Sequence, residues 1–180
     1  NWEALVADLE TIAEVRFGGP VAVLGHSLGG ALALRWAATH PARIRALVVS
    51  SGFARVFTPP AARVARYVEQ PAVLAAMRWL PGAWSARLVA RLAARRAWVF
   101  DAHCDPHVTE LVRFGVRHVP LGLVRQRIRL ALQADLRPLL PSVTCPTLLV
   151  HGEHDTPFAL AAAGELERGR AAELTGYQER

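Results

Sequence analysis

The sequence has no lysine and only two cysteines among its 180 residues, and all 21 of its basic side chains are arginine. Without lysine, the Gly-x-x-x-x-Gly-Lys-Ser/Thr loop that binds nucleoside triphosphates is excluded, and the Gly-x-Gly-x-x-Gly pattern of dinucleotide-binding loops is also absent. Cys104 and Cys145 lie 41 residues apart, without the spacing of a zinc site or a disulfide framework. We therefore expect buried thiols and no metal site.

Long apolar runs and targeting signals are missing as well. The longest stretch without a charged side chain, residues 17–34, contains five glycines and a proline, which favours a turn over a membrane span. The N-terminus does not show the basic-then-apolar pattern of a secretory signal. The sequence therefore predicts a compact soluble domain that is not transmembrane, with the cytoplasm as its default location.

Signatures of nucleic-acid binding are absent although the formal net charge is +6. No zinc-finger spacing, aromatic RNA-binding signature or basic heptad region accompanies the arginines. The many arginines and alanines, together with the lack of lysine, are typical of drift toward GC-rich codons. We expect no nucleic-acid partner.

Alternating helical and strand-like patterns predict an α/β fold. Residues 3–15 carry apolar side chains at helical spacing, and the Gly-Gly-Pro of residues 18–20 ends that helix. Residues 21–24 form a continuous apolar run, which is typical of a parallel strand buried on both faces. A helix is expected over residues 31–39 and a second buried strand over residues 46–50.

Beyond these elements, strand-like runs vanish between residues 57 and 138, where helical spacing broken by proline and glycine takes their place. The strand pattern then returns. We predict a mostly parallel sheet of three or four strands, with core segments at residues 1–56 and 139–180 and a helical insertion at residues 57–138. Helices of the insertion are expected at 61–69, 71–79, 85–99, 107–117 and 121–134, and later elements at 146–150 (strand), 158–168 (helix) and 172–177 (strand).

Gly25-His26-Ser27-Leu28-Gly29 matches the Gly-x-Ser-x-Gly pattern of a nucleophile elbow, and it follows a strand and precedes a helix as that motif requires. A serine on such a sharp turn has a strained backbone, and side chains at Gly25 and Gly29 are expected to collide with neighbouring backbone. The turn would raise the Ser27 hydroxyl above the strand and let the Leu28 N–H stabilise an oxyanion. The alternative is a glycine-rich turn that holds an ordinary serine.

Residues 21–30, 39–44 and 146–157 resemble the α/β-hydrolase superfamily in its serine esterase and lipase-like branch. The resemblance implies a partial α/β-hydrolase sheet with a helical cap or lid made by the insertion, and it matches Asp155 to the acid of the catalytic triad. Asp155 also follows a strand end, on the same rim as Ser27 if the strands are parallel. The alternative is that Asp155 caps the following helix.

The family's third triad member, a histidine after the last strand, has no match here, since no histidine follows His154. The family's early strands, with a second oxyanion donor, have no counterpart before residue 3. The resemblance thus implies a fragment that lacks the N-terminal strands and the catalytic histidine. We expect a missing histidine rather than a substitute base at His26, His151 or His154.

The function implied by the resemblance is a serine hydrolase that cleaves a small-molecule carboxylic ester or acyl substrate through an acyl-enzyme intermediate, without a metal or organic cofactor. Ser27 would attack the carbonyl, and Asp155 would orient the base. Thioesterase, lipase and lactonase activities stay open because the elbow is shared among them. The competing interpretation is a non-catalytic ligand-binding protein on the same scaffold.

The positive charge is concentrated on the predicted lid. Residues 55–137 hold 14 arginines and five acidic side chains, whereas the rest of the chain has seven arginines and ten acidic side chains. One interpretation is an anionic partner, such as a membrane surface, an acyl carrier protein or an acidic substrate. The other is a solvated helix face in an arginine-biased sequence.

Overall fold

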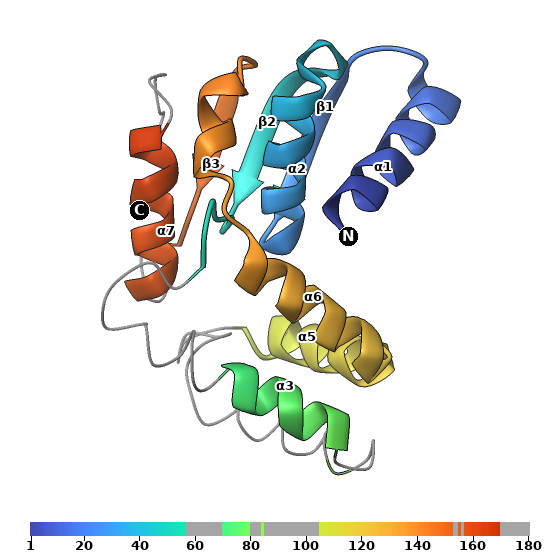
Figure 1. Cartoon of the computed structure of the whole chain (residues 1–180), viewed down its shortest axis with the longest axis vertical. Helices are drawn as coiled ribbons and strands as arrows, with labels where there is room; N and C mark the ends of the chain where they lie inside the picture. The colour runs from blue at the N-terminus through green and yellow to red at the C-terminus, as the bar shows by residue number, and fades with distance from the viewer. Residues whose placement is uncertain (57–69, 80–83, 85–104, 153–154, 156, 170–180) are drawn as a thin grey trace. The chain divides into compact units, whose positions relative to one another are not determined.

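The computed structural model shows a three-stranded parallel sheet and its covering helices (Figure 1). The chain divides into two compact units, one made of residues 1–58 with 130–180 and the other of residues 59–129. Each unit is described by itself. The structure describes residues 1–56, 70–79, 84, 105–152, 155 and 157–169.

The sheet has the order β1-β2-β3, formed by β1 (Val21–His26), β2 (Ile44–Ser50) and β3 (Thr147–Val150). All three strands are parallel, and His26, Ser50 and Val150 are register partners across them. The strands therefore end together at one edge. This arrangement confirms the predicted α/β class and parallel sheet, and a strand is found at each of the predicted positions 21–24, 46–50 and 146–150.

The helix between the first two strands, α2 (Leu28–Thr39), lies over one face of β1 and β2 (Figure 1). It begins directly at the glycine-rich motif and ends at Thr39, with His40 as its C-cap, because Pro41 starts the short 3-10 helix η1 (Pro41–Arg43). Val49 of β2 points at this helix, since its Cγ1 lies 3.0 Å from the place where a Cβ on Gly30 would be. The helix thus fixes the elbow against the sheet.

The first helix, α1 (Trp2–Phe17), ends where the sequence predicts, at Gly18 with φ +64°. Polar contacts attach it to the segment after β1. Arg35 of α2 pairs with Glu3 at 2.7 Å, and Arg43 Nε donates to Glu10 Oε2 at 3.1 Å. The hydrogen-bonded carboxylate of Glu14 is the main cause that raises the pKa of Arg43. Charge pairing therefore supplements a helix that buries few apolar side chains.

The prediction that residues 21–24 are buried on both faces is wrong. Ala22 and Leu24 are exposed, Leu24 by 71%, whereas Val21 and Val23 are half-buried. The reason is positional: among the described residues, β1 pairs only with β2, and α2 covers only the face of Val21 and Val23.

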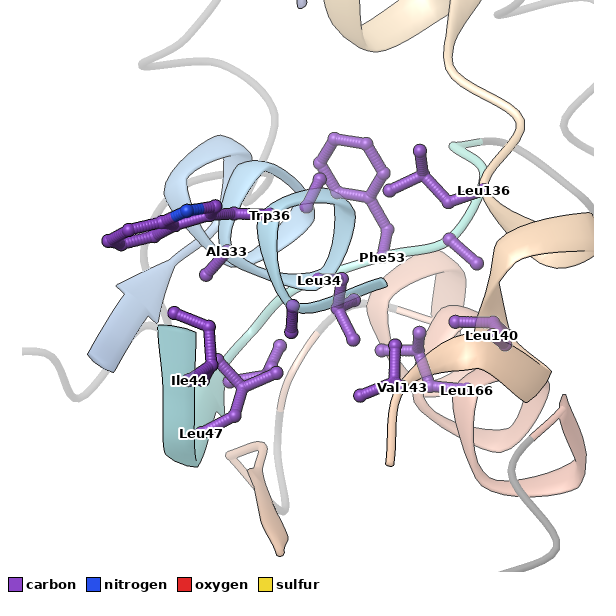
Figure 2. Close-up of a cluster of buried hydrophobic side chains, with 14 of the residues drawn as sticks. Ala33, Leu34, Trp36, Ile44, Leu47, Phe53, Leu136, Leu140, Val143 and Leu166 are labelled. Atoms are coloured by element: carbon purple, nitrogen blue, oxygen red, sulfur yellow. The ribbon is translucent and has the colours of Figure 1, made fainter. Parts of the chain in front are cut away.

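The core of the first unit joins segments that are far apart in the sequence (Figure 2). Part of it comes from the 3-10 helix η4 (Arg137–Ser142), which the sequence did not predict. The Leu136 N–H donates to the Ala54 carbonyl at 2.9 Å, so the residues before η4 belong to this unit, although the insertion was predicted to extend to residue 138. The largest fully buried side chains are Leu34, Leu47, Val49, Leu136, Leu140 and Leu166.

The remaining helices agree with the predicted positions where the structure describes them. They are α3 (Gln70–Trp79), α5 (Pro106–His118), α6 (Leu121–Gln133) and α7 (Pro157–Gly169). The helices predicted at 61–69 and 85–99 and the strand at 172–177 lie outside the described residues. Among the described helices, none has the length and apolar character needed to cross a bilayer.

Candidate active site

The register between the strands continues for one residue beyond each strand end. The Ser27 N–H donates to the Ser50 carbonyl at 2.9 Å, and the Ser51 N–H donates to the Val150 carbonyl at 2.8 Å. Ser27, Ser51 and His151 therefore each come directly after one strand, at the carboxyl edge of the sheet. In open α/β sheets this edge is where ligands bind.

Ser27 occupies the sharp turn that the motif predicts. Its φ is +54° and its ψ is −118°, a conformation that costs a non-glycine residue about 1–3 kcal/mol. The turn is held by the N–H groups of Gly30 and Ala31, which donate to the Ser27 carbonyl at 3.0 and 3.2 Å. Although Ser27 stands at the N-cap of α2, its hydroxyl makes no capping hydrogen bond, and the residue is exposed. The hydroxyl is thus accessible to a bound molecule.

The glycines of the motif have different roles. A Cβ on Gly25 would lie 2.4 Å from the Gly29 carbonyl oxygen, so the predicted collision is confirmed at this position. The prediction is wrong for Gly29, where a Cβ would meet nothing within 4 Å. Gly29 is on the exposed side of α2, whereas the next residue, Gly30, faces Val49. Crowding therefore requires Gly25 and Gly30.

Leu28 and His26 flank the serine on the two sides of the turn. Leu28 is the first residue of α2, so its N–H has no acceptor within the helix and lies at the positive end of the helix dipole. The exposed His26 ring approaches another residue, with Nδ1 3.3 Å from Ser50 Oγ. In the part of the chain that the structure describes, no histidine is hydrogen-bonded to the Ser27 hydroxyl.

Asp155 lies in the loop after β3, where its N–H donates to the Gly152 carbonyl at 3.1 Å. Its Oδ2 accepts a hydrogen bond from Ser51 Oγ at 3.3 Å and lies 4.0 Å from His151 Nδ1. The helix α7 begins at Pro157, two residues later. The residue directly before this helix is 156, which lies outside the described residues, so the alternative that Asp155 caps the helix is not tested. The carboxylate is thus held at the same edge of the sheet as Ser27.

Ser51 is the part of this cluster that the motifs in the sequence did not indicate. Its φ is +45°. In the described ranges, Ser27 and Ser51 are the non-glycine residues with a positive φ. A signal was present, because Ser50-Ser51-Gly52 places hydroxyls directly after a buried apolar strand. No motif assigns such a pair a role, so only the fold connects Ser51 with Asp155.

His151 is the buried titratable group of the cluster. Its side chain is 8% exposed, and neither ring nitrogen has a hydrogen-bond partner among the residues described. Burial lowers the pKa of His151, and the nearby Asp155 carboxylate acts in the opposite direction. The imidazole is therefore neutral at pH 7.

Metal-binding groups are not found in the described ranges, where no three histidine, cysteine or acidic side chains gather closely enough to hold an ion. Cys145 is a buried thiol, as predicted, and its Sγ lies 3.9 Å from Thr147 Oγ1. Cys104 and His154 lie outside the described residues. The chemistry of the described cluster is thus that of hydroxyl, imidazole and carboxylate.

Curated relatives are esterases by name. Pimeloyl-[acyl-carrier protein] methyl ester esterase of Chromobacterium violaceum is 31% identical over 163 residues, covering 86% of this chain and 61% of that protein. The protein of the same name from Neisseria meningitidis is 25% identical over 169 residues, covering 82% of this chain and 57% of its own length. The chain thus spans about three-fifths of the length of these relatives.

Solved structures share the fold. An esterase from Exiguobacterium antarcticum has a TM-score of 0.75 at 20% identity, covering 99% of this chain and 66% of that chain. The enol-lactonase from Burkholderia xenovorans LB400 has a TM-score of 0.71 at 23% identity, covering 98% of this chain and 64% of that chain. A family model described as serine aminopeptidase, S33, matches residues 1–173. The parallel sheet, the strand–turn–helix elbow and this match agree, and the chain belongs to the S33 family of α/β-hydrolases.

Proposed function

We propose that this α/β-hydrolase is a serine hydrolase that cleaves carboxylic esters, with Ser27 as nucleophile, Asp155 as the acid that orients the base, and the Leu28 N–H as an oxyanion donor. The observation that carries the proposal is the Ser27 turn. A strained φ of +54° is retained at an exposed serine whose hydroxyl does not cap the helix that it begins. Strain of this kind persists where a function depends on the geometry.

In the proposed reaction, Ser27 Oγ attacks the ester carbonyl carbon while its proton passes to a base. The carbonyl oxygen becomes an oxyanion that accepts a hydrogen bond from the Leu28 N–H. When the bond to the alcohol breaks, the protonated base returns its proton to the leaving oxygen and an acyl ester of Ser27 remains. Water attacks this ester with the same base, which releases the acid and restores Ser27.

The base of this reaction is proposed to be a histidine beyond residue 180. Support comes from His26, which faces Ser50, and from His151, which faces Asp155. A serine hydroxyl without a base is a poor nucleophile at neutral pH. A non-catalytic ligand-binding protein on the same scaffold is the second candidate, and the absence of a histidine bonded to Ser27 among the described residues favours it.

A fluorophosphonate probe tests the nucleophile. We expect the full gene product to be labelled at Ser27 and the Ser27→Ala variant to lose labelling, with ester turnover lost in parallel. Ser142→Ala is the matched control, since Ser142 is an exposed serine on η4. Equal labelling of Ser27→Ala and the unchanged protein would refute Ser27 as nucleophile. Absence of labelling in both would support the ligand-binding candidate.

The acyl substrate and its carrier are a further part of the proposal. We propose that the insertion forms a cap and that its arginines engage an anionic partner, since exposed Arg127 and Arg129 lie on α6 and exposed Arg78 on α3. The named relatives act on an ester attached to acyl-carrier protein. A cytoplasmic location belongs to the same proposal.

Salt dependence tests the anionic partner. We expect an Arg127→Gln/Arg129→Gln variant to bind an acidic carrier-linked ester more weakly and with less salt dependence, because two positive charges are removed. Turnover of an uncharged short-chain ester should stay unchanged. Arg16→Gln on α1 is the control, because this arginine is exposed on the first unit. Equal salt dependence in all three proteins would support the codon-bias interpretation.

A further inference from the structure

Ser51 joins two strand ends at the edge of the sheet. Its N–H donates to the Val150 carbonyl of β3 at 2.8 Å, so its backbone is fixed at the position where β3 ends. Its hydroxyl donates to Asp155 Oδ2 at 3.3 Å, in the loop after that strand and 104 residues away in the sequence. One residue thus contacts β3 through its backbone and the acidic loop through its side chain.

The Ser51 hydroxyl holds one of the two carboxylate oxygens of Asp155, Oδ2. The Asp155 side chain is 25% exposed, and its backbone N–H donates to the Gly152 carbonyl within the same loop. A carboxylate has two oxygens, and holding one of them by a donor fixes the direction in which the other faces. An acid that orients a base needs this fixed direction as well as its charge, because it holds the imidazole in one orientation and stabilises the imidazolium.

The backbone of Ser51 supports a role for its hydroxyl. Its φ of +45° lies in the region that glycine adopts without strain. Glycine would satisfy the backbone at this position, and the next residue is in fact Gly52. A serine there retains strain, and what it adds over glycine is the hydroxyl that reaches Asp155.

We propose that Ser51 is a positioning residue that holds the Asp155 carboxylate through its hydroxyl in the orientation that ester hydrolysis requires. This inference rests on the proposed role of Asp155. In this proposal Ser51 acts through Asp155. His151 lies near the same oxygen, with its Nδ1 4.0 Å from Asp155 Oδ2.

Turnover of a p-nitrophenyl ester by the full gene product tests the inference through three variants. We expect Ser51→Ala and Ser51→Gly to lower kcat about 10-fold with KM changed less than about 2-fold, because one oriented hydrogen bond is lost. Ser51→Thr keeps the hydroxyl and should recover most of kcat. Ser51→Gly removes the strain along with the hydroxyl, so it should fold at least as stably as the unchanged protein. A kcat retained by Ser51→Gly would overturn the inference.

Asp155→Asn separates this inference from the proposed function. We expect kcat to fall on the order of 10³-fold or more in Asp155→Asn, and the double variant Ser51→Ala/Asp155→Asn to lose nothing further, since both changes act at one carboxylate. Additive losses would assign Ser51 a role independent of Asp155. Normal turnover by Asp155→Asn would instead refute the acid itself. A crystal structure of Ser51→Gly gives a readout without turnover, in which an undisplaced Asp155 carboxylate would contradict the positioning role.

Discussion

Ser27 and Ser51 stand at equivalent places at the ends of two neighbouring parallel strands. Both have a positive φ, +54° and +45°, and both donate their backbone N–H to the carbonyl at the end of the next strand. The two serines differ in the segment that each one begins. Ser27 leads into a helix, whereas Ser51 leads into a loop that starts with Gly52.

A positive φ at the end of a strand thus presents the two hydroxyls in different surroundings. At Ser27 the start of α2 supplies unpaired N–H groups and a positive dipole beside an exposed hydroxyl. At Ser51 the hydroxyl is half-buried and donates to the Asp155 carboxylate. The comparison teaches that the strained turn only places a serine at the sheet edge, and that its neighbours decide what the hydroxyl can do.

The largest expected effect is the loss of ester turnover when Ser27, rather than Ser51, is replaced. Ser27→Ala should reduce ester turnover by about 10⁴-fold or more, since removing the nucleophile eliminates the acyl-enzyme route. Ser51→Ala should lose only about 10-fold, the worth of one oriented hydrogen bond. Single-turnover kinetics of both variants measure the ratio. Comparable losses would show that the two hydroxyls do not have separate roles.

The next effect concerns the backbone that forms the Ser27 turn. Gly25→Ala would place a Cβ 2.4 Å from the Gly29 carbonyl oxygen, and its three nearest atoms are all backbone atoms of Gly29 and Gly30, so no flexible side chain can move away. We expect the free energy of unfolding to fall by about 3 kcal/mol, at the upper end for overpacking. Urea denaturation measures the change. A loss below about 1 kcal/mol would show that the elbow accommodates side chains at this position.

Most of the fold could be predicted from sequence because its signals are local. The apolar run ending at Leu24, the helix stop at Gly18 and the strand before Ser50 each show their pattern within about ten residues. The exposure of Leu24 could not be predicted, since an apolar run does not show whether its strand lies in the middle of a sheet or at its edge. The helix η4 was missed because six residues with two prolines show no helical period.

The residues of the site also differ in whether the sequence predicts them. Ser27 can be inferred from a motif because the strand, turn and helix that define an elbow are consecutive in the chain. The contact between Ser51 and Asp155 joins residues 104 positions apart, and nothing near Ser51 in the sequence indicates it. The exception within the motif is Gly29, whose requirement was inferred from the pattern rather than from the space around its Cβ.

A smaller effect is expected from the buried histidine beside Asp155. Because burial lowers the pKa of His151, the unfolded chain takes up a proton below about pH 6.5 that the folded chain does not. Stability should therefore fall as the pH drops below that value, by at most about 1.4 kcal/mol per pH unit from this group, and should be constant in this respect above it. Asp155, the charged group facing the ring, reduces the effect.

The measurement is the free energy of unfolding between about pH 5 and pH 8, compared with His151→Phe. The variant keeps an aromatic ring and removes the titration, so its slope on the acid side should be shallower. His107→Phe, at an exposed position on α5, is the control substitution. If His151→Phe retains the full acid-side slope, the loss of stability arises from other groups.

The smallest effect is expected at Gly29, where the elbow motif and the structure disagree. A Cβ at this position meets nothing within 4 Å, and the residue lies in the exposed first turn of α2. Gly29→Ala should therefore change the free energy of unfolding by no more than about 0.5 kcal/mol, in contrast to Gly25→Ala. The same urea titration compares the two variants. A large loss at Gly29 would show that a side chain at this position destabilises the folded turn despite the open space around it. A small one would restrict the structural requirement of the motif to Gly25 and to Gly30, which lies outside it.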